Sequence, residues 1–332
     1  MQKKVHTFTS QEAINQINAL ASRNTPFLFL IDFQAENAII LPQDSINPDE
    51  LLYQIGNKTN IKEHAYSKYN QLTQWNISPT SFNDYRVKFD EVQYEIHKGN
   101  SFLTNLTQPT RIETNLTLKD IFYNSKALYK LWLKDWFAVF SPEIFIKIEN
   151  GIISSYPMKG TIDASLPDAE NTILNDEKEK AEHATIVDLI RNDLSMVADN
   201  VEVKRFRYID ILHTNNADLL QVSSHIEGKL PENYLLNLGE ILFKLLPAGS
   251  ISGAPKPKTL EIIKQTEGYE REFYTGICGF FDGHNLDCGV MIRFIELINN
   301  QFVFKSGGGI TFLSDARKEY EELIQKVYVP IY

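Results

Sequence analysis

Short apolar runs of strand type occur in groups along this sequence, and this grouping limits the fold more than any other feature. Strands are predicted over Pro26–Asp32, Ala38–Leu41, Trp136–Phe140, Ile144–Glu149, Ile152–Tyr156, Ile277–Phe281, Cys288–Leu297 and Gln301–Ser306. Apolar periodicity and flanking Pro and Gly residues predict helices over Tyr85–Lys98, Asp176–Ala198, Lys258–Thr266 and about Ala316–Val327. Because strands and helices do not alternate regularly, the pattern favours an α+β fold over a doubly wound parallel sheet.

Two of these segments support more detailed predictions. Asn150 and Gly151 separate two strand-like runs, which predicts a hairpin through an Asn-Gly turn. Such a turn would place Glu143 opposite about residue 158, and therefore beside Lys159. On the helix predicted from Asp176, the stripe expected to face the core consists of Ala184, Val187, Ile190, Leu194 and Val197.

The composition excludes several classes of protein. The chain of 332 residues has 33 Lys and Arg against 43 Asp and Glu, a net charge of −10, and lacks a basic cluster, so nucleic-acid binding is not expected. Its two cysteines, Cys278 and Cys288, form neither a disulfide framework nor a zinc motif, which favours a cytoplasmic location. The polar N-terminus and the short apolar run Pro26–Ile31 predict that the chain is neither exported nor inserted into a membrane.

Two pairs of glutamates have the spacing of a carboxylate site on helices. Glu179 and Glu182 are three residues apart on one predicted helix, and Glu319 and Glu322 repeat the spacing on the last one. Together they could form an oxygen-rich site for Mg²⁺, which takes one or two carboxylates and keeps several waters. The alternative from spacing alone is a solvated acidic face on each helix.

Lys159 and Glu143 form a second candidate site. A lysine can act as a nucleophile when its surroundings lower its pKa, and a neighbouring carboxylic acid can protonate the leaving group. Placed side by side on rigid strands, the two residues would suit a displacement reaction. The alternative is an ion pair at the edge of a sheet.

Two glycine-rich segments and one arginine complete the candidates. Residues 247–256 contain Gly249, Ser250, Ser252 and Gly253 but no Walker motif, and they could present backbone N–H groups to an anion, as could residues 306–309. Taken alone, each segment favours a tight turn over an anion site. Arg293 lies within an apolar predicted strand and needs either an internal carboxylate or an anionic ligand as its partner.

Taken in order, the motifs resemble those of the chorismate-utilising enzymes, which include aminodeoxychorismate, anthranilate and isochorismate synthases. The resemblance runs from about Lys88 to the C-terminus in eight separated blocks. These are Ser141–Glu143, Pro157–Thr161, Ala181–Leu194, Gly249–Lys256, Tyr274–Gly279, Ile292–Arg293, Gly307–Ile310 and Glu319–Lys326. Eight blocks in the family's order make a chance match very improbable.

The resemblance implies a role for each matching residue. Glu182 and Glu322 would bind Mg²⁺ directly, with Glu179 and Glu319 as outer partners through water, and the metal would hold the ring carboxylate of chorismate. Tyr274, Arg293 and Lys326 would bind the enolpyruvyl carboxylate. The other residues that it assigns to substrate binding are Thr161, Gly249, Ser250, Ser252, Gly253, Ala254, Gly307, Gly308 and Gly309.

Within that family, a lysine at position 159 is typical of aminodeoxychorismate synthases, whereas anthranilate synthases have alanine there. Isochorismate and salicylate synthases also have a lysine at this position, where it acts as a base that activates water. The implied mechanism has Lys159 attack C2 of the ring while Glu143 protonates the departing C4 hydroxyl. Ammonia then adds at C4, supplied by a separate glutamine amidotransferase subunit, since the chain has no glutaminase triad. Isochorismate synthase, anthranilate synthase component I and a non-catalytic anion-binding protein of the same fold remain alternatives. In the family, a histidine usually stands at the position of Leu220.

The resemblance also implies the arrangement of the fold. It predicts two large, mostly antiparallel β-sheets packed as a sandwich, with the helices outside. No internal repeat or flexible linker divides the sequence, so we expect one catalytic domain over residues 1–332. Residues 1–80 would form a shortened β-rich part and residues 81–332 the core that carries the motifs.

Overall fold

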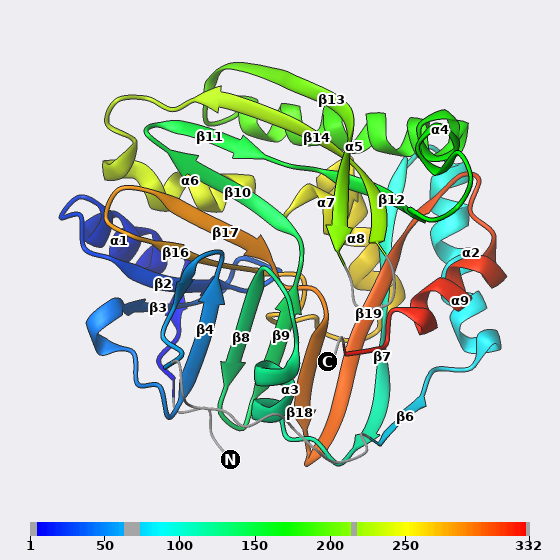
Figure 1. Cartoon of the computed structure of the whole chain (residues 1–332), viewed down its shortest axis with the longest axis horizontal. Coiled ribbons are helices and arrows are strands. Elements are labelled where there is room, and N and C mark those ends of the chain that lie inside the picture. Colours follow the sequence, from blue (N-terminus) through cyan, green and yellow to red (C-terminus); the bar gives the residue numbers. More distant parts are fainter. Residues whose placement is uncertain (1–4, 63–73, 214–217, 330–332) are drawn as a thin grey trace.

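A computed structural model describes residues 5–62, 74–213 and 218–329 of the chain. The described strands form two antiparallel sheets, which we call sheet A and sheet B (Figure 1). Sheet A has ten strands, which are β1 (Phe8–Thr9), β3 (Asn37–Pro42), β2 (Phe27–Ile31), β16 (Ile277–Phe281), β17 (Leu286–Val290), β10 (Ile144–Glu149), β11 (Ile152–Ser155), β14 (Asp218–Lys229) and β12 (Met158–Asp163), with β13 (Asp199–His213) paired to β14.

Sheet B contains the remaining strands of the described chain. In order across the sheet they are β15 (Gly253–Ala254), β7 (Leu103–Thr114), β19 (Gln301–Thr311), β18 (Phe294–Ile298), β9 (Phe137–Ser141), β8 (Tyr129–Leu133), β4 (Leu51–Ile55) and β5 (Lys58–Thr59), with β6 (Trp75–Ser78) paired to β7. Both sheets combine strands from distant parts of the chain. The N-terminal strand β2, for example, pairs with β16, which lies about 250 residues later in the sequence.

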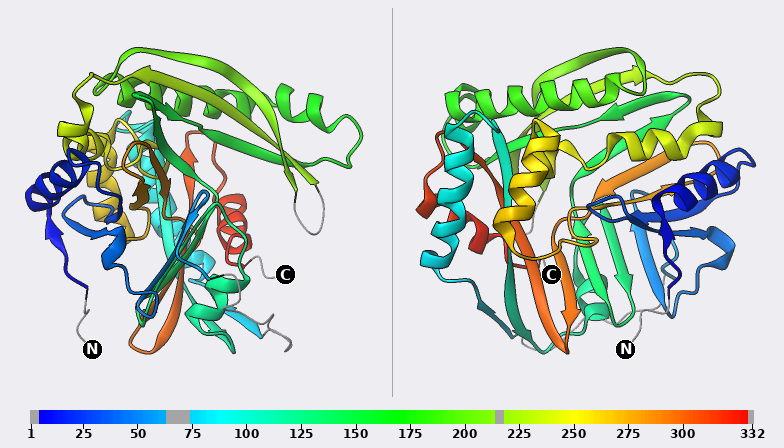
Figure 2. Two further views of the ribbon diagram at one scale, coloured as in Figure 1. Left: turned by 60° about the vertical axis from the view of Figure 1, so that its left-hand side comes forward. Right: turned by 180° about the vertical axis from the view of Figure 1, so that it is seen from behind.

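Helices cover the outside of the two sheets. They are α1 (Ser10–Ala21), α2 (Phe82–His97), α3 (Leu118–Asn124), α4 (Ala169–Asn175), α5 (Glu177–Ser195), α6 (Leu238–Leu245), α7 (Gly249–Ser252), α8 (Lys256–Glu267) and α9 (Ala316–Gln325), with short 3₁₀ turns at Gln43–Ser45 and Tyr234–Asn237. Figure 2 shows α1 beside α6 and α2 beside α8, and it shows α5 lying along the long strands β13 and β14. No helix of the described chain has both the length and the apolar character needed to span a membrane.

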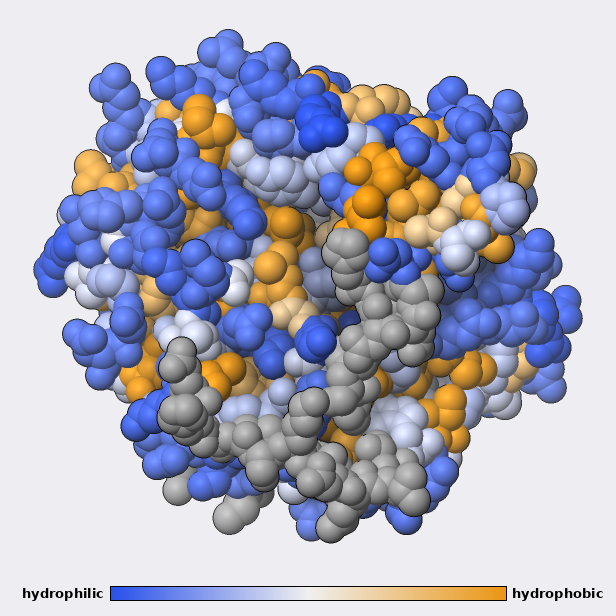
Figure 3. Space-filling model, in the orientation of Figure 1, coloured by the Kyte–Doolittle hydropathy of each residue, from blue (hydrophilic) through white to orange (hydrophobic). Residues whose placement is uncertain are grey.

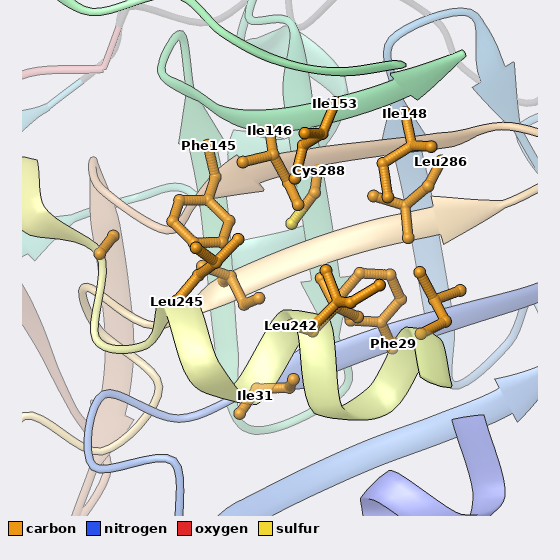
Figure 4. Close-up of a cluster of buried hydrophobic side chains, with 14 of the residues drawn as sticks. Phe29, Ile31, Phe145, Ile146, Ile148, Ile153, Leu242, Leu245, Leu286 and Cys288 are labelled. Carbon is orange, nitrogen blue, oxygen red and sulfur yellow. The ribbon is translucent and has the colours of Figure 1, made fainter. Parts of the chain in front are cut away.

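The main hydrophobic cores lie between the sheets and beneath the helices. Leu28 and Leu30 of sheet A pack with Leu131 and Val139 of sheet B, so these apolar faces leave water together. On the opposite face of sheet A, Leu242 and Leu245 of α6 point toward the strands, among them Phe29 of β2 (Figure 4). This arrangement confirms the predicted α+β fold with two antiparallel sheets and outer helices.

The structure confirms some local predictions and corrects others. The Asn-Gly hairpin has the predicted register, with Ile148 opposite Ile153. Val187 and Leu194 of α5 are buried as predicted, but Ala184 is exposed. Instead, α5 buries the residue before Ala184, which is His183. The polar side chain of His183 contacts β14.

Two strand predictions were wrong in their extent. The predicted strand Cys288–Leu297 is two strands, since β17 ends at Val290 and β18 begins at Phe294 in the other sheet. The chain changes sheets through Arg293, whose φ of 53° is incompatible with an extended strand. In contrast, β19 continues through Gly307–Gly309 to Thr311, so these glycines belong to a strand and do not form the tight turn considered as an alternative.

Candidate active site

A pocket of about 630 Å³ lies where the strands β12 and β19 approach α5 and α9. Its volume is in the range of small-molecule sites. The sequence-predicted residues that line it are Glu143, Lys159, Thr161, Glu179, Ser250, Tyr274, Arg293, Gly307, Gly308, Gly309, Glu322 and Lys326.

Most of the surface in Figure 3 is hydrophilic, and a group of apolar residues lies at the upper right, over β12 and β13 of Figure 1.

Lys159 reaches the pocket from a distorted part of β12. The pairing of β12 with β14 shifts between Lys159 and Thr161, and Gly160 between them has a φ of 73°, a left-handed conformation that favours glycine. Both flanking residues line the pocket because of this bulge. Lys159 Nζ lies 2.7 Å from Glu182 Oε2.

Acidic side chains surround the Lys159 ammonium group. Burial by itself lowers the pKa of Lys159, but Glu182, Glu179 and Glu322 together raise it above its ordinary value. In this arrangement Lys159 is charged at neutral pH. It can act as a nucleophile only after it leaves Glu182 and loses its proton.

Glu143 lies immediately before β10 and has different partners. The Ser250 hydroxyl of α7 donates a hydrogen bond to Glu143 Oε1. Burial raises the pKa of Glu143, although Ser250 and the positive charges of Arg293 and Lys326 oppose this effect. A raised pKa favours the protonated carboxyl, which is the form that a general acid requires.

The predicted side-by-side placement of Glu143 and Lys159 on a hairpin is wrong. β11 ends at Ser155, and Met158 and Lys159 pair with Ser223 and Val222 of β14 instead of with the strand that follows Glu143. The ion pair considered as an alternative is absent from the described residues as well, since Lys159 pairs with Glu182. The two side chains are instead brought into one pocket by the packing of separate strands.

The cationic side of the pocket contains Arg293 and Lys326. Arg293 lies between β17 and β18, with its Cζ atom 5.4 Å from the centre of the Tyr328 ring. Within the described part of the chain it has no carboxylate partner within 4.0 Å, so an internal salt bridge does not explain it. Lys326 Nζ donates to the carbonyl oxygen of Gly307 at 2.9 Å.

Tyr274 and the glycines of β19 add neutral hydrogen-bonding groups. Burial raises the pKa of the Tyr274 phenol, so this hydroxyl stays protonated and can donate to an anion. β18 pairs with β19 only as far as Lys305, which leaves the same edge of Gly307–Gly309 facing the pocket. A Cβ atom on Gly308 would lie 3.6 Å from Glu319 Oε2 and 3.8 Å from Lys326 Nζ.

The four predicted metal ligands come from two helices on neighbouring walls. Asp176 caps α5 by accepting from the backbone N–H of Glu179 at 2.9 Å, which places Glu179 and Glu182 in the first two turns. Glu319 and Glu322 belong to α9, and Glu322 Oε1 lies 2.7 Å from Lys326 Nζ. Among the described residues, no three acidic, histidine or cysteine side chains converge closely enough to hold a metal. Carboxylate oxygens are nevertheless the donors that Mg²⁺ prefers, so the residues fit this ion by their chemistry.

Six predicted site residues do not line the large pocket. Glu182 contacts it through Lys159, and Glu319 lies beside Gly308. Gly249 lines a smaller cavity behind Glu143. The other three support the wall from behind, since Ser252 is buried and donates to the Ala248 carbonyl, and Gly253 and Ala254 form β15 against β7.

The pocket also contains polar residues that the sequence did not single out. Asn105, Gln221 and Thr275 line it, each from a strand or loop in which a polar residue is unremarkable. A polar residue in an alternating strand is typical of a solvent-facing position. Therefore no local signal distinguished Asn105 and Gln221 from ordinary surface residues, whereas Thr275 lies within the motif block Tyr274–Gly279.

Because His183, next to Glu182, is buried, we expect the stability of the folded protein to depend on pH. Burial, with the positive charges of Arg207 and Lys159, lowers the pKa of His183 from 6.5 to about 4. As the pH falls from 6.5 to 4, the unfolded chain binds a proton that the folded chain does not, so the free energy of unfolding decreases by about 3 kcal/mol. Urea unfolding across this range should show a smaller decrease for His183→Gln, whereas His284→Gln, at an exposed histidine, should match the wild type. Equal pH slopes for His183→Gln and wild type would refute the assignment.

Comparison with known proteins extends the match beyond the motifs. Residues 9–331 match the family model described as chorismate binding enzyme. An uncharacterized PabA-like protein of Haemophilus influenzae is 51% identical over 97% of this chain and 98% of its own. Aminodeoxychorismate synthase component 1 of Escherichia coli is 29% identical over 90% of this chain and 66% of its own.

A solved structure agrees with these relatives. The crystal structure of anthranilate synthase component I from Streptococcus pneumoniae matches with a TM-score of 0.66 and 27% identity, over 76% of this chain and 58% of that one. The family match covers the first strands as well as the pocket, whereas the sequence motifs began near Lys88. The chain therefore belongs to the family of chorismate-binding enzymes.

Proposed function

We propose that this protein is an aminodeoxychorismate synthase component I, which aminates chorismate at C4 to give 4-amino-4-deoxychorismate. The observation that carries the proposal is the presence of Lys159 and Glu143 in one pocket. Family membership makes chorismate the substrate, and Lys159 supplies the nucleophile that the amination requires. A relative in Escherichia coli bears the name of this enzyme.

The charges of the pocket suit a substrate with two carboxylates. Arg293, Lys326 and the Tyr274 hydroxyl would bind the enolpyruvyl carboxylate at one end. At the other end, Glu182 and Glu322 would hold Mg²⁺ directly, with Glu179 and Glu319 through water. The ion would supply positive charge for the ring carboxylate. A chain with a net negative charge would thereby have a positively charged site for a substrate that carries two negative charges.

Lys159 and Glu143 have complementary roles in the proposed reaction. The neutral Lys159 amine attacks C2, both ring double bonds shift by one position toward C4, and the C4 hydroxyl departs as water with a proton from Glu143. Ammonia then attacks C4, both double bonds shift back, the bond from C2 to Lys159 breaks, and the added nitrogen returns a proton to Glu143. The burial that raises the pKa of Glu143 supports its role as the acid.

Ammonia would come from a separate glutamine amidotransferase subunit, and the product would enter 4-aminobenzoate and folate biosynthesis in the cytoplasm. The chain itself supplies the chorismate site and the nucleophile. Free ammonium at high concentration should therefore replace the partner in an assay of the isolated chain.

One assay tests the proposed function against its alternatives. The purified chain is incubated with chorismate, Mg²⁺ and ammonium, and the product is identified by mass and chromatography. We expect 4-amino-4-deoxychorismate. Isochorismate or anthranilate would reassign the protein within its family, and chorismate binding without turnover would indicate a non-catalytic protein.

A further inference from the structure

We infer that Lys159 and the divalent cation compete for Glu182, so that binding of the metal and release of Lys159 from this carboxylate are one event. The inference rests on the proposed function, in which Glu182 is a direct metal ligand and Lys159 is the nucleophile. It gives Lys159 a second role, because the lysine then controls access to the metal site.

The first observation concerns which side chain faces the pocket. Lys159 lines the large pocket, whereas Glu182 does not. Lys159 Nζ lies 2.7 Å from Glu182 Oε2, and the Lys159 side chain is 32% exposed while that of Glu182 is 11% exposed. The lysine therefore separates the carboxylate from the pocket. An ion that enters from the pocket reaches Glu182 only if Lys159 moves away.

The second observation is that the Lys159 ammonium group lies among the predicted metal ligands. Glu182, Glu179 and Glu322 all act on its charge, and these carboxylates come from both acidic helices. The backbone of β12 is also close to them, since a Cβ atom on Gly160 would lie 3.1 Å from Glu179 Oε2. An ammonium group and a divalent ion on the same carboxylate would repel each other, so one displaces the other.

The second lysine of the site, Lys326, differs from Lys159 in this respect. Its Nζ lies 2.7 Å from Glu322 Oε1, but Glu322 itself lines the pocket and its side chain is 55% exposed. An ion can therefore reach Glu322 without moving Lys326. Lys326 Nζ also donates to the Gly307 carbonyl at 2.9 Å, a contact that does not involve the carboxylate. Control of access thus belongs to Lys159.

The exchange connects metal binding to the supply of the nucleophile. While Lys159 pairs with Glu182, its nitrogen is held at the wall of the pocket. A cation that takes over Glu182 removes the partner that holds it there. Lys159 therefore becomes available to chorismate in the same protein molecules that carry the metal.

The test measures metal affinity in the absence of chorismate, so it does not depend on catalysis. Mn²⁺ binds to oxygen ligands as Mg²⁺ does, and the free ion is followed by electron paramagnetic resonance as Mn²⁺ is added to the purified chain. We expect Lys159→Met, which keeps the length of the side chain and removes its charge, to bind Mn²⁺ about tenfold more tightly than the wild type.

Two further variants separate direct competition from the general effect of a lost positive charge. Arg293→Met removes a pocket cation that has no carboxylate partner within 4.0 Å in the described chain, and it should tighten Mn²⁺ binding by about twofold or less. Glu182→Gln should weaken Mn²⁺ binding. Combined with Glu182→Gln, Lys159→Met should no longer tighten it, because the contested carboxylate is gone.

The inference is overturned if Lys159→Met tightens Mn²⁺ binding no more than Arg293→Met does, if it weakens binding, or if neither it nor the wild type binds the ion. Thermal unfolding checks that each variant is folded. The proposed function is decided separately by the product of the chorismate assay. If the wild-type chain makes no 4-amino-4-deoxychorismate, that function fails, and the Mn²⁺ affinities still decide whether Lys159 and the metal compete.

Discussion

Replacing Lys159 with alanine lowers the rate of 4-amino-4-deoxychorismate formation by at least about a thousandfold, because the variant lacks the amine that forms the covalent intermediate. The change also leaves Glu182 without its lysine partner at 2.7 Å. Chorismate affinity, measured by fluorescence, therefore separates a loss of chemistry from a loss of binding. The matched control is Lys147→Ala, since Lys147 is a partly buried lysine of β10 that pairs with Asp287 outside the pocket.

Intact-protein mass spectrometry provides a second measurement on the same variant. Wild-type protein mixed with chorismate and Mg²⁺, without ammonium, should gain the mass of chorismate less water. Lys159→Ala should not gain it. An unchanged rate of amination in Lys159→Ala would show that the proposed covalent step does not occur, whatever product the wild type makes.

Replacing Arg271 with leucine lowers the free energy of unfolding by about 3–5 kcal/mol, because it leaves a buried carboxylate without its cation. Arg271 and Glu267 side chains are each 1% exposed, and their closest N···O distance is 2.6 Å. All five N–H donors of the guanidinium are used. The acceptors are both oxygens of Glu267, the carbonyls of Asn105 and Ile251, and the Thr275 hydroxyl.

Urea unfolding of three further variants tests this explanation. Arg86→Ala removes an exposed cation that pairs with Asp90 at 3.6 Å on α2 and should change stability by less than about 1 kcal/mol. Glu267→Leu combined with Arg271→Leu should cost less than the sum of the single changes, since no unpaired charge remains. Wild-type stability in Arg271→Leu would contradict the conclusion that this buried guanidinium stabilises the fold through Glu267 and the carbonyls of Asn105 and Ile251.

Local sequence patterns predicted the elements whose signals lie within a few residues. The Asn-Gly turn set the register of β10 and β11, and the period of the α5 residues placed Val187 and Leu194 in the core. The same patterns gave wrong predictions where the backbone leaves the regular conformation of a helix or strand. Arg293 has a left-handed φ that ends the strand predicted through it, and no local hydrophobic pattern signals such a residue.

In the candidate site, too, the sequence predicted some features and not others. The order of the motifs identified Lys159, Glu143, Arg293 and Lys326, all of which line one pocket. It did not indicate that Lys159 pairs with Glu182 instead of lying beside Glu143, because that pairing joins β12 to α5. Ser252 and Gly253 belong to a motif yet do not line the pocket, since Ser252 donates to the Ala248 carbonyl and Gly253 pairs with β7 in β15.

By itself, the sequence determined the α+β class, the main helices and hairpin, and the residue types available for chemistry, because these depend on local periodicity and turn propensity. Only the tertiary structure decided which charges meet, which glycines of β19 line the pocket, and that Asn105 is a pocket residue with an unsatisfied oxygen. These features depend on contacts between strands far apart in the chain. A local pattern specifies the face that a side chain occupies, whereas the packing of the two sheets selects its neighbour.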